Sequence, residues 1–366
     1  MINTRLIMVE GLPTTGKTTN SDFLRMQLER NGKIVEWLHE DARPHPLMAM
    51  SQACMTNREY EDLIENNPEL ISMLNSAATF RKSTVGIDLF MLEKKNRDKI
   101  EAPVYEKILT FDSFRLTLDN YEKHMIEKWE LFSDRANKNQ DTIYIMDSIL
   151  LQNQIWMFLL NNKPYEKLAK YVNKLCDAVK ELNPVIINFY RANAESTIDF
   201  IEHNRGIQWL EHVGKRDKTK PYYQGKQEGA ESFKQFLRDY AHMSMTLLHN
   251  IDCNSLPIEI SKGNWTEYEN SILHFLNIDN IASPVFLPPS GIFFNQEYDS
   301  KFIIDGLTIQ YPDGRNRKLT PKTAQDFYVE RLPIILRFDN PEHFTITGTQ
   351  INEPWATIGT IYTKTT

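Results

Sequence analysis

The sequence predicts an α/β protein with a doubly wound, parallel, five-stranded sheet and a small β-rich C-terminal domain. Three observations predict this class. Apolar strand patterns alternate with helical patterns as far as Leu276. A glycine-containing loop joins the first strand to the first helix. After Asn280 the sequence contains several prolines and short strand patterns in which apolar and polar residues alternate. At 366 residues the chain exceeds one compact domain, so we expect two domains, 1–280 and 285–366.

The loop after the first strand has the most specific pattern in the chain. An apolar run leads into Gly11-x-x-x-x-Gly16-Lys17-Thr18, and a helical pattern follows as far as Gly32. Glycines let successive backbone N–H groups face a polyphosphate, Lys17 is placed to reach its β- and γ-phosphate oxygens, and the Thr18 hydroxyl is placed to bind Mg²⁺. This Walker A pattern predicts a nucleoside triphosphate site, whose expected binding residues are Gly11, Pro13, Thr14, Thr15, Gly16, Lys17, Thr18 and Thr19.

A later strand pattern, 141–148, has an acidic residue, Asp147, near its end. A carboxylate at the end of a parallel strand next to the phosphate loop would help to hold Mg²⁺, as a Walker B element does. An ordinary capping role for Asp147 is the alternative. The expected metal ligands are therefore Thr18 and Asp147.

The strand pattern 33–39 ends in the acidic pair Glu40 and Asp41. A carboxylate there would orient an acceptor hydroxyl and accept its proton, provided that it lies within hydrogen-bonding reach. Capping of the following segment explains the pair equally well. Glu40, Asp41 and Asp147 are thus alternative candidates for the catalytic base.

Two further segments interrupt the alternation of strands and helices. Residues 43–113 read as a helical insertion, and residues 191–222, after the strand pattern 185–190, read as a lid that contains Arg205 and Arg216. The guanidinium fork suits a clamp on phosphate oxygens, whereas surface ion pairing is the alternative for both arginines.

Composition narrows the class of partner and the compartment. The net charge of −7 argues against general nucleic-acid binding, and no window of about 18 apolar residues predicts a membrane span. Cys54, Cys176 and Cys253 lack the spacing of a disulfide framework or a zinc site. We therefore expect a cytoplasmic protein with a small-molecule partner. The sequence is compatible with a homodimer.

Together, these elements resemble the nucleoside and nucleotide kinase branch of the P-loop NTPases, and thymidylate kinase-like proteins in particular. The resemblance rests on four segments. They are residues 9–19, the acidic pair Glu40 and Asp41 after the strand 33–39, residues Ile145 to Ser148, and residues 183–190, which lead into an Arg-bearing helix. It implies ATP and Mg²⁺ as cofactors, Lys17 on the donor phosphates, and lid arginines, Arg205 before Arg216, over the transferring group. Thymidylate kinases have Arg-Glu-Pro after the second strand of the fold and an arginine after the acidic residue that corresponds to Asp147. This chain has neither, so the sequence does not identify the acceptor.

The expected function is phosphoryl transfer from ATP to a nucleoside, a nucleotide or a similar hydroxyl or phosphate compound. One alternative is a nucleotide-dependent regulatory ATPase or switch that binds a partner through the C-terminal domain. Another is a degenerate kinase that only binds a ligand.

Overall fold

The structure is a computed structural model that describes residues 3–365; residues 1, 2 and 366, at the ends of the two expected domains, and the side chains of 94–96 and 354 lie outside the described residues. A parallel five-stranded sheet forms its centre, and the predicted fold class is confirmed. The strands, in their order across the sheet, are β2 (Ile34–Leu38), β6 (Thr142–Asp147), β1 (Leu6–Gly11), β7 (Val185–Tyr190) and β8 (Asn254–Glu259). Because β1 lies between β6 and β7, the loop after β1 starts between Asp147 and Phe189.

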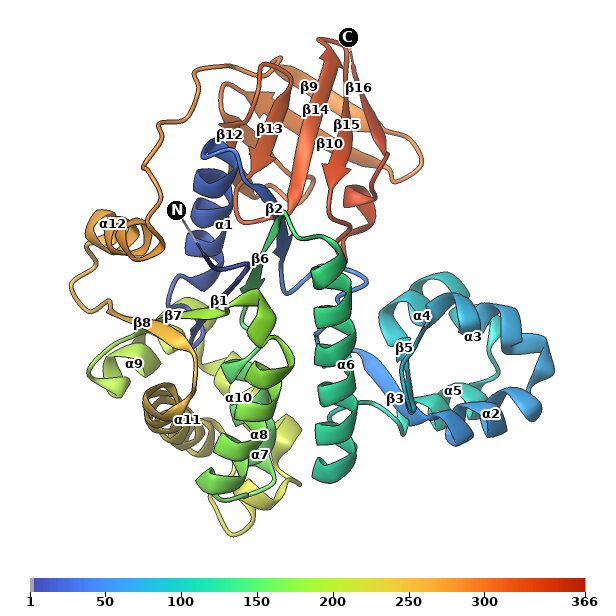
Figure 1. Ribbon diagram of the computed structural model, residues 1–366. Helices are drawn as coiled ribbons and strands as arrows, with labels where there is room; N and C mark the ends of the chain where they lie inside the picture. Colours follow the sequence, from blue (N-terminus) through green and yellow to red (C-terminus); the bar gives the residue numbers. More distant parts are fainter. Residues whose placement is uncertain (1–2, 366) are drawn as a thin grey trace.

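Helices cover both faces of this sheet, as a parallel sheet requires (Figure 1). One face packs against α1 (Lys17–Arg30) and α12 (Trp265–Leu276) through apolar residues such as Leu24 and Ile272. The other face has the largest core, to which Trp129 and Phe158 belong. The helices on that face are α6 (Leu118–Lys138), α7 (Leu151–Leu160), α8 (Tyr165–Ala178) and α11 (Ala230–Asn250).

The insertion predicted as helical contains helices and also a three-stranded antiparallel sheet of order β3-β5-β4. It lies beside α6 and has its own core (Figure 1). The sequence pattern did not indicate these strands because they are short and lie between helices. The elements are β3 (Gln52–Thr56), α2 (Asn57–Glu65), α3 (Ile71–Ala77), β4 (Ala78–Phe80), β5 (Thr84–Asp88), α4 (Leu89–Asn96) and α5 (Ala102–Leu109).

The predicted lid segment forms two helices, α9 (Ala194–Arg205) and α10 (Ile207–Asp217). They meet at Gly206, whose φ of 80° a side chain would disfavour. Short 3-10 helices complete the helical content at Pro68–Leu70, Arg97–Lys99, Lys180–Leu182, Pro221–Tyr223 and Pro354–Ala356.

The β-rich C-terminal domain is a closed antiparallel barrel, in which consecutive strands pair and β9 joins β16 to β10. Aromatic side chains such as Phe302, Phe344 and Tyr362 fill its interior. The short strands predicted for this domain are present, and their closure into a barrel is what the sequence pattern did not indicate. The barrel strands are β9 (Gly291–Asn295), β10 (Ser300–Asp305), β11 (Thr308–Gln310), β12 (Asn316–Pro321), β13 (Asp326–Val329), β14 (Ile334–Asn340), β15 (His343–Gly348) and β16 (Ile361–Lys364).

The barrel packs on α1 and on the segment after β2 (Figure 1). The Arg331 N–H donates to Oδ2 of Asp22 on α1 at 2.7 Å. The Arg43 N–H donates to the Gln350 carbonyl oxygen at 2.8 Å, and Ala42 pairs with Ile351 as an isolated antiparallel bridge. The barrel therefore contacts both the helix that follows the phosphate loop and the segment that follows Glu40.

Within residues 3–365, the helices fall short of the combined length and apolar character that crossing a membrane requires.

Candidate functional site

The loop from Gly11 to Lys17 turns sharply at the carboxyl end of β1. Gly11, Thr14 and Gly16 have φ angles of 145°, 67° and 87°, a region that side chains disfavour. A Cβ atom on Gly11 would lie 2.5 Å from the Phe189 carbonyl oxygen, so this position requires glycine. Among the described residues, no side chain caps the start of α1. Its first N–H groups therefore face the loop, where they would bind an anion.

Lys17 lies buried at the centre of the site. Its Nζ donates to the Leu12 carbonyl oxygen at 3.0 Å. Burial lowers the pKa of Lys17, and the negative charges of Asp147, Glu40 and Glu10 oppose this decrease, with Asp147 contributing most. The phosphate-loop lysine and three carboxylates from β1, β6 and the end of β2 thus converge at one edge of the sheet.

Asp147 is 0% exposed and lies opposite Val9 in the sheet. Its Oδ1 accepts a hydrogen bond from the Ser148 hydroxyl at 2.9 Å, whereas its buried Oδ2 has no hydrogen-bond partner among residues 3–365. A buried carboxylate oxygen without a partner is unfavourable, and a cation would satisfy it. Asp147 therefore has the chemistry of a metal ligand.

Thr18 and Asp147 offer oxygen atoms of the kind that bind Mg²⁺. Within the described part of the chain, no group of three or more His, Cys, Asp or Glu side chains forms a protein cage for a metal. Mg²⁺ in phosphoryl-transfer sites is commonly held by one or two protein oxygens together with phosphates and water. The half-buried Thr18 and the buried Asp147 supply such a partial set.

The two acids after β2 have different surroundings. Burial and the nearby Asp147 charge raise the pKa of Glu40 to about 7. The Asp41 side chain is 54% exposed, with its Oδ2 3.7 Å from Nδ1 of the buried His39. Glu40 therefore belongs to the charged cluster around Lys17, whereas Asp41 lies at its margin.

The two arginines of the predicted lid segment also have different surroundings. Arg205, at the end of α9, is exposed, and its guanidinium lies 4.9 Å from the centre of the Trp209 ring. Its positive charge is close enough to lower the pKa of both Lys17 and Glu40. Arg216 instead makes two hydrogen bonds, of 2.8 and 2.6 Å, to the carboxylate of its neighbour Asp217. Arg205 thus acts on the cluster only through its charge, and Arg216 has the ion pair of the alternative interpretation.

Sequence reasoning missed Glu10, the residue before Gly11. It is 0% exposed, and its Oε1 and Oε2 accept hydrogen bonds from the N–H groups of Leu150, at 2.7 Å, and Gln152, at 3.2 Å. Burial raises its pKa to about 7. Its signal in the sequence is an acid inside an otherwise apolar strand, directly before the loop.

A cavity of about 300 Å³ adjoins the first half of the loop on the face that α11 covers. Gly11, Leu12 and Thr15 line one side of it, and residues of β7, α9 and α11 line the others. Sequence reasoning gave no indication of this cavity, because its walls come from segments far apart in the chain.

A parallel five-stranded sheet with this loop between β1 and α1 fits the P-loop class of nucleotide-binding folds. No protein-family model and no curated protein sequence matches the chain. A solved structure with some similarity is that of the YorR protein of Bacillus subtilis in complex with phosphorylated GDP. It has a TM-score of 0.35 and 10% identity, with 74% of this chain and 95% of that chain covered. This similarity is too low to assign a function.

Proposed function

We propose that the protein is an ATP- and Mg²⁺-dependent, thymidylate kinase-like phosphotransferase. Its acceptor is a nucleoside, a nucleotide or a similar compound with a hydroxyl or phosphate group. One observation carries the proposal: the buried Asp147, with an unpartnered Oδ2, lies near the phosphate-loop lysine at the carboxyl edge of the sheet. Ligands of open α/β sheets bind at that edge.

In this proposal the loop N–H groups and Lys17 hold the donor phosphates. Lys17 Nζ exchanges its hydrogen bond to the Leu12 carbonyl oxygen for bonds to the β- and γ-phosphate oxygens. Thr18 and Asp147 would hold Mg²⁺, and a cation bound there would neutralise charge on the phosphate oxygens. Arg205 adds a positive charge from the lid side as negative charge develops on the transferring group.

Glu40 is the proposed base for a hydroxyl acceptor. A general base works best when its pKa lies near the working pH, and the pKa of Glu40 is raised to about 7. Asp41 is the weaker candidate, because its side chain is 54% exposed and directed towards His39. Asp147 is better suited to the metal, since its free oxygen is completely buried.

The proposal is tested by ADP release from ATP over a series of Mg²⁺ concentrations, with and without a panel of nucleosides, nucleoside monophosphates and sugar alcohols. Acceptor-stimulated ADP release is expected to fall about 10²- to 10³-fold in Asp147→Asn, and the Mg²⁺ requirement is expected to rise. Asp141→Asn, an exposed acid just before the same strand, is the control and should behave like the wild type. An Asp147→Asn variant with unchanged rate and unchanged Mg²⁺ dependence would refute the proposed site.

A further inference from the structure

The cavity next to the phosphate loop has the size of a small-molecule site. Its volume of about 300 Å³ lies at the lower end of the range for such pockets. Its walls are the end of β7, the start of α9 and the middle of α11. Leu12 and Met245 contribute apolar surface, and Asn188 and Tyr240 contribute polar groups.

Both polar groups are buried and lack a good partner. Asn188 is 1% exposed; its Oδ1 has no partner among the described residues, and its Nδ2 donates only to the Met245 sulfur, at 3.6 Å. Tyr240 is 2% exposed, and its hydroxyl likewise has no partner within residues 3–365. Buried polar atoms are normally paired, and a third atom on the same wall, Nη1 of Arg191, also has no partner within residues 3–365, so a ligand in this cavity would have three unpaired groups to bond with.

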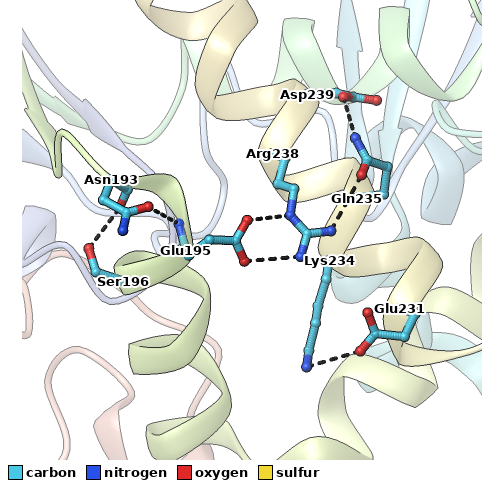
Figure 2. A network of polar contacts seen from close by, with 8 residues as sticks. All are labelled: Asn193, Glu195, Ser196, Glu231, Lys234, Gln235, Arg238 and Asp239. Carbon is cyan, nitrogen blue, oxygen red and sulfur yellow. Dashed lines mark hydrogen bonds and ion pairs between the residues drawn. The ribbon is translucent and has the colours of Figure 1, made fainter.

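The walls of the cavity are held together without a ligand. On the rim, Arg238 of α11 makes a two-point ion pair with Glu195 in the first turn of α9, with Nη2 3.0 Å from Oε2 (Figure 2). One turn away, Lys234 contacts Glu231 at 3.2 Å and Glu202 of α9 at 2.9 Å. The cavity is therefore preformed, which reduces the entropy lost on binding.

The polar groups fit the edge of a nucleobase. An asparagine amide presents an acceptor and a donor side by side, and each nucleobase presents a neighbouring donor and acceptor on its pairing edge. The Tyr240 hydroxyl adds a third hydrogen-bonding group, and the apolar side chains of Leu12 and Met245 suit the faces of a planar ring.

The position of the cavity relates it to the acceptor and not to the donor. Of the loop, residues Gly11, Leu12 and Thr15 line the cavity, and within the described residues 16–19 do not. The donor phosphates belong at Lys17 and Thr18, at the start of α1, which covers the opposite face of the sheet from α11. We propose that this cavity binds the base of a nucleoside or nucleoside monophosphate acceptor, an inference that rests on the proposed function.

Calorimetric titration of the full chain without ATP tests the inference. The ligands are the four deoxynucleoside 5′-monophosphates and, as a base-free control, 2-deoxyribose 5-phosphate. At least one nucleotide is expected to bind more tightly than the base-free compound. Tyr240→Phe should weaken that binding about 2- to 10-fold, the value of one neutral hydrogen bond, and Asn188→Leu should weaken it more.

Tyr144→Phe is the matched control, because Tyr144 also has a buried, unpartnered hydroxyl among the described residues but does not line the cavity. It should bind like the wild type. Removal of the unpartnered Tyr240 hydroxyl should not lower the melting temperature, so this variant carries the test even if Asn188→Leu does not fold.

Three outcomes would overturn the inference: none of the nucleotides binds, the base-free compound binds as tightly, or Tyr240→Phe binds the nucleotide as tightly as the wild type does. Failure of the proposed function looks different. In that case the nucleotides still bind in a Tyr240-dependent way, but ATP and Mg²⁺ yield no phosphorylated product.

Discussion

Two buried carboxylates next to the loop differ in what satisfies them. The Glu10 oxygens accept hydrogen bonds from the N–H groups of Leu150 and Gln152 at the start of α7, so this acid is a structural cap. The Asp147 Oδ2 has no such donor among the described residues. The difference assigns Glu10 to the framework of the site and leaves Asp147 for a ligand.

For single residues, we predict that Lys17→Met reduces phosphoryl transfer at least about 10²-fold, because a buried positive charge is lost where phosphate charge would develop. Its melting temperature should equal or exceed that of the wild type, since burial disfavours the charged lysine, as its lowered pKa indicates. Initial rates and thermal unfolding measure the two effects. Lys163→Met, which changes an exposed lysine, is the control. Full activity in Lys17→Met would rule out the assigned donor site.

A second prediction concerns Glu10 and pH. Its pKa is about 7 in the folded protein and near 4.5 when unfolded, so between these values the folded state binds the extra proton. The free energy of unfolding should therefore fall as pH rises from about 4.5 to about 7, by up to about 3 kcal/mol from this group.

Urea unfolding of the wild type and of Glu10→Gln at several pH values measures this contribution. The Glu40 pKa is raised in the same direction, so the informative quantity is the difference between the two proteins. The wild type should lose more stability over this pH range than the variant. Parallel pH profiles would contradict the prediction.

Among the elements, the lid offers a matched pair of arginines. Arg205→Ala should reduce acceptor-stimulated ADP release at least about tenfold, because Arg205 is close enough to affect the pKa values of Lys17 and Glu40. Arg216→Ala should have little effect, because Arg216 is bound to Asp217. Steady-state rates of the two variants decide the point. Equal losses, or a larger loss in Arg216→Ala, would contradict the assignment.

The elements also show how far sequence reasoning reaches. The predicted strands 33–39, 141–148 and 185–190 match β2, β6 and β7, because each is a short and mostly apolar run. Lys17, Asp147 and Glu40 come together because parallel strands end at one edge of the sheet. Asn188 and Tyr240 could not be linked in advance, since they line one cavity only after α11 packs near β7. Closure of the barrel could not be predicted either, because it depends on the pairing of β9 with β16, which lie at opposite ends of the domain.

In the whole molecule, the barrel and the domain of the parallel sheet share a polar contact on α1. Asp22 pairs with Arg25 at 2.6 Å and also accepts the Arg331 N–H of the barrel. The Arg25 guanidinium lies between Trp37, at 4.8 Å, and Tyr328 of the barrel, at 4.5 Å. This contact fixes the barrel to the helix whose first residue is Lys17.

Asp22→Ala should therefore destabilise the protein strongly, by about 3–5 kcal/mol, because it leaves Arg25 buried without its partner. Chemical denaturation measures the loss. Asp313→Ala, which breaks the exposed pair between Asp313 and Arg315 on the barrel, is the control and should leave stability nearly unchanged. Similar, small effects of both changes would mean that the contact on α1 does not join the two parts.

The proposed function requires that the γ-phosphate of ATP is transferred to a small acceptor at this loop. The most direct measurement follows γ-labelled ATP, with Mg²⁺ and the nucleoside and nucleotide panel, and isolates the labelled products. We expect label on an acceptor with the wild type and at least about 10²-fold less with Lys17→Met. Label found only in inorganic phosphate, or equal transfer by both proteins, would contradict it.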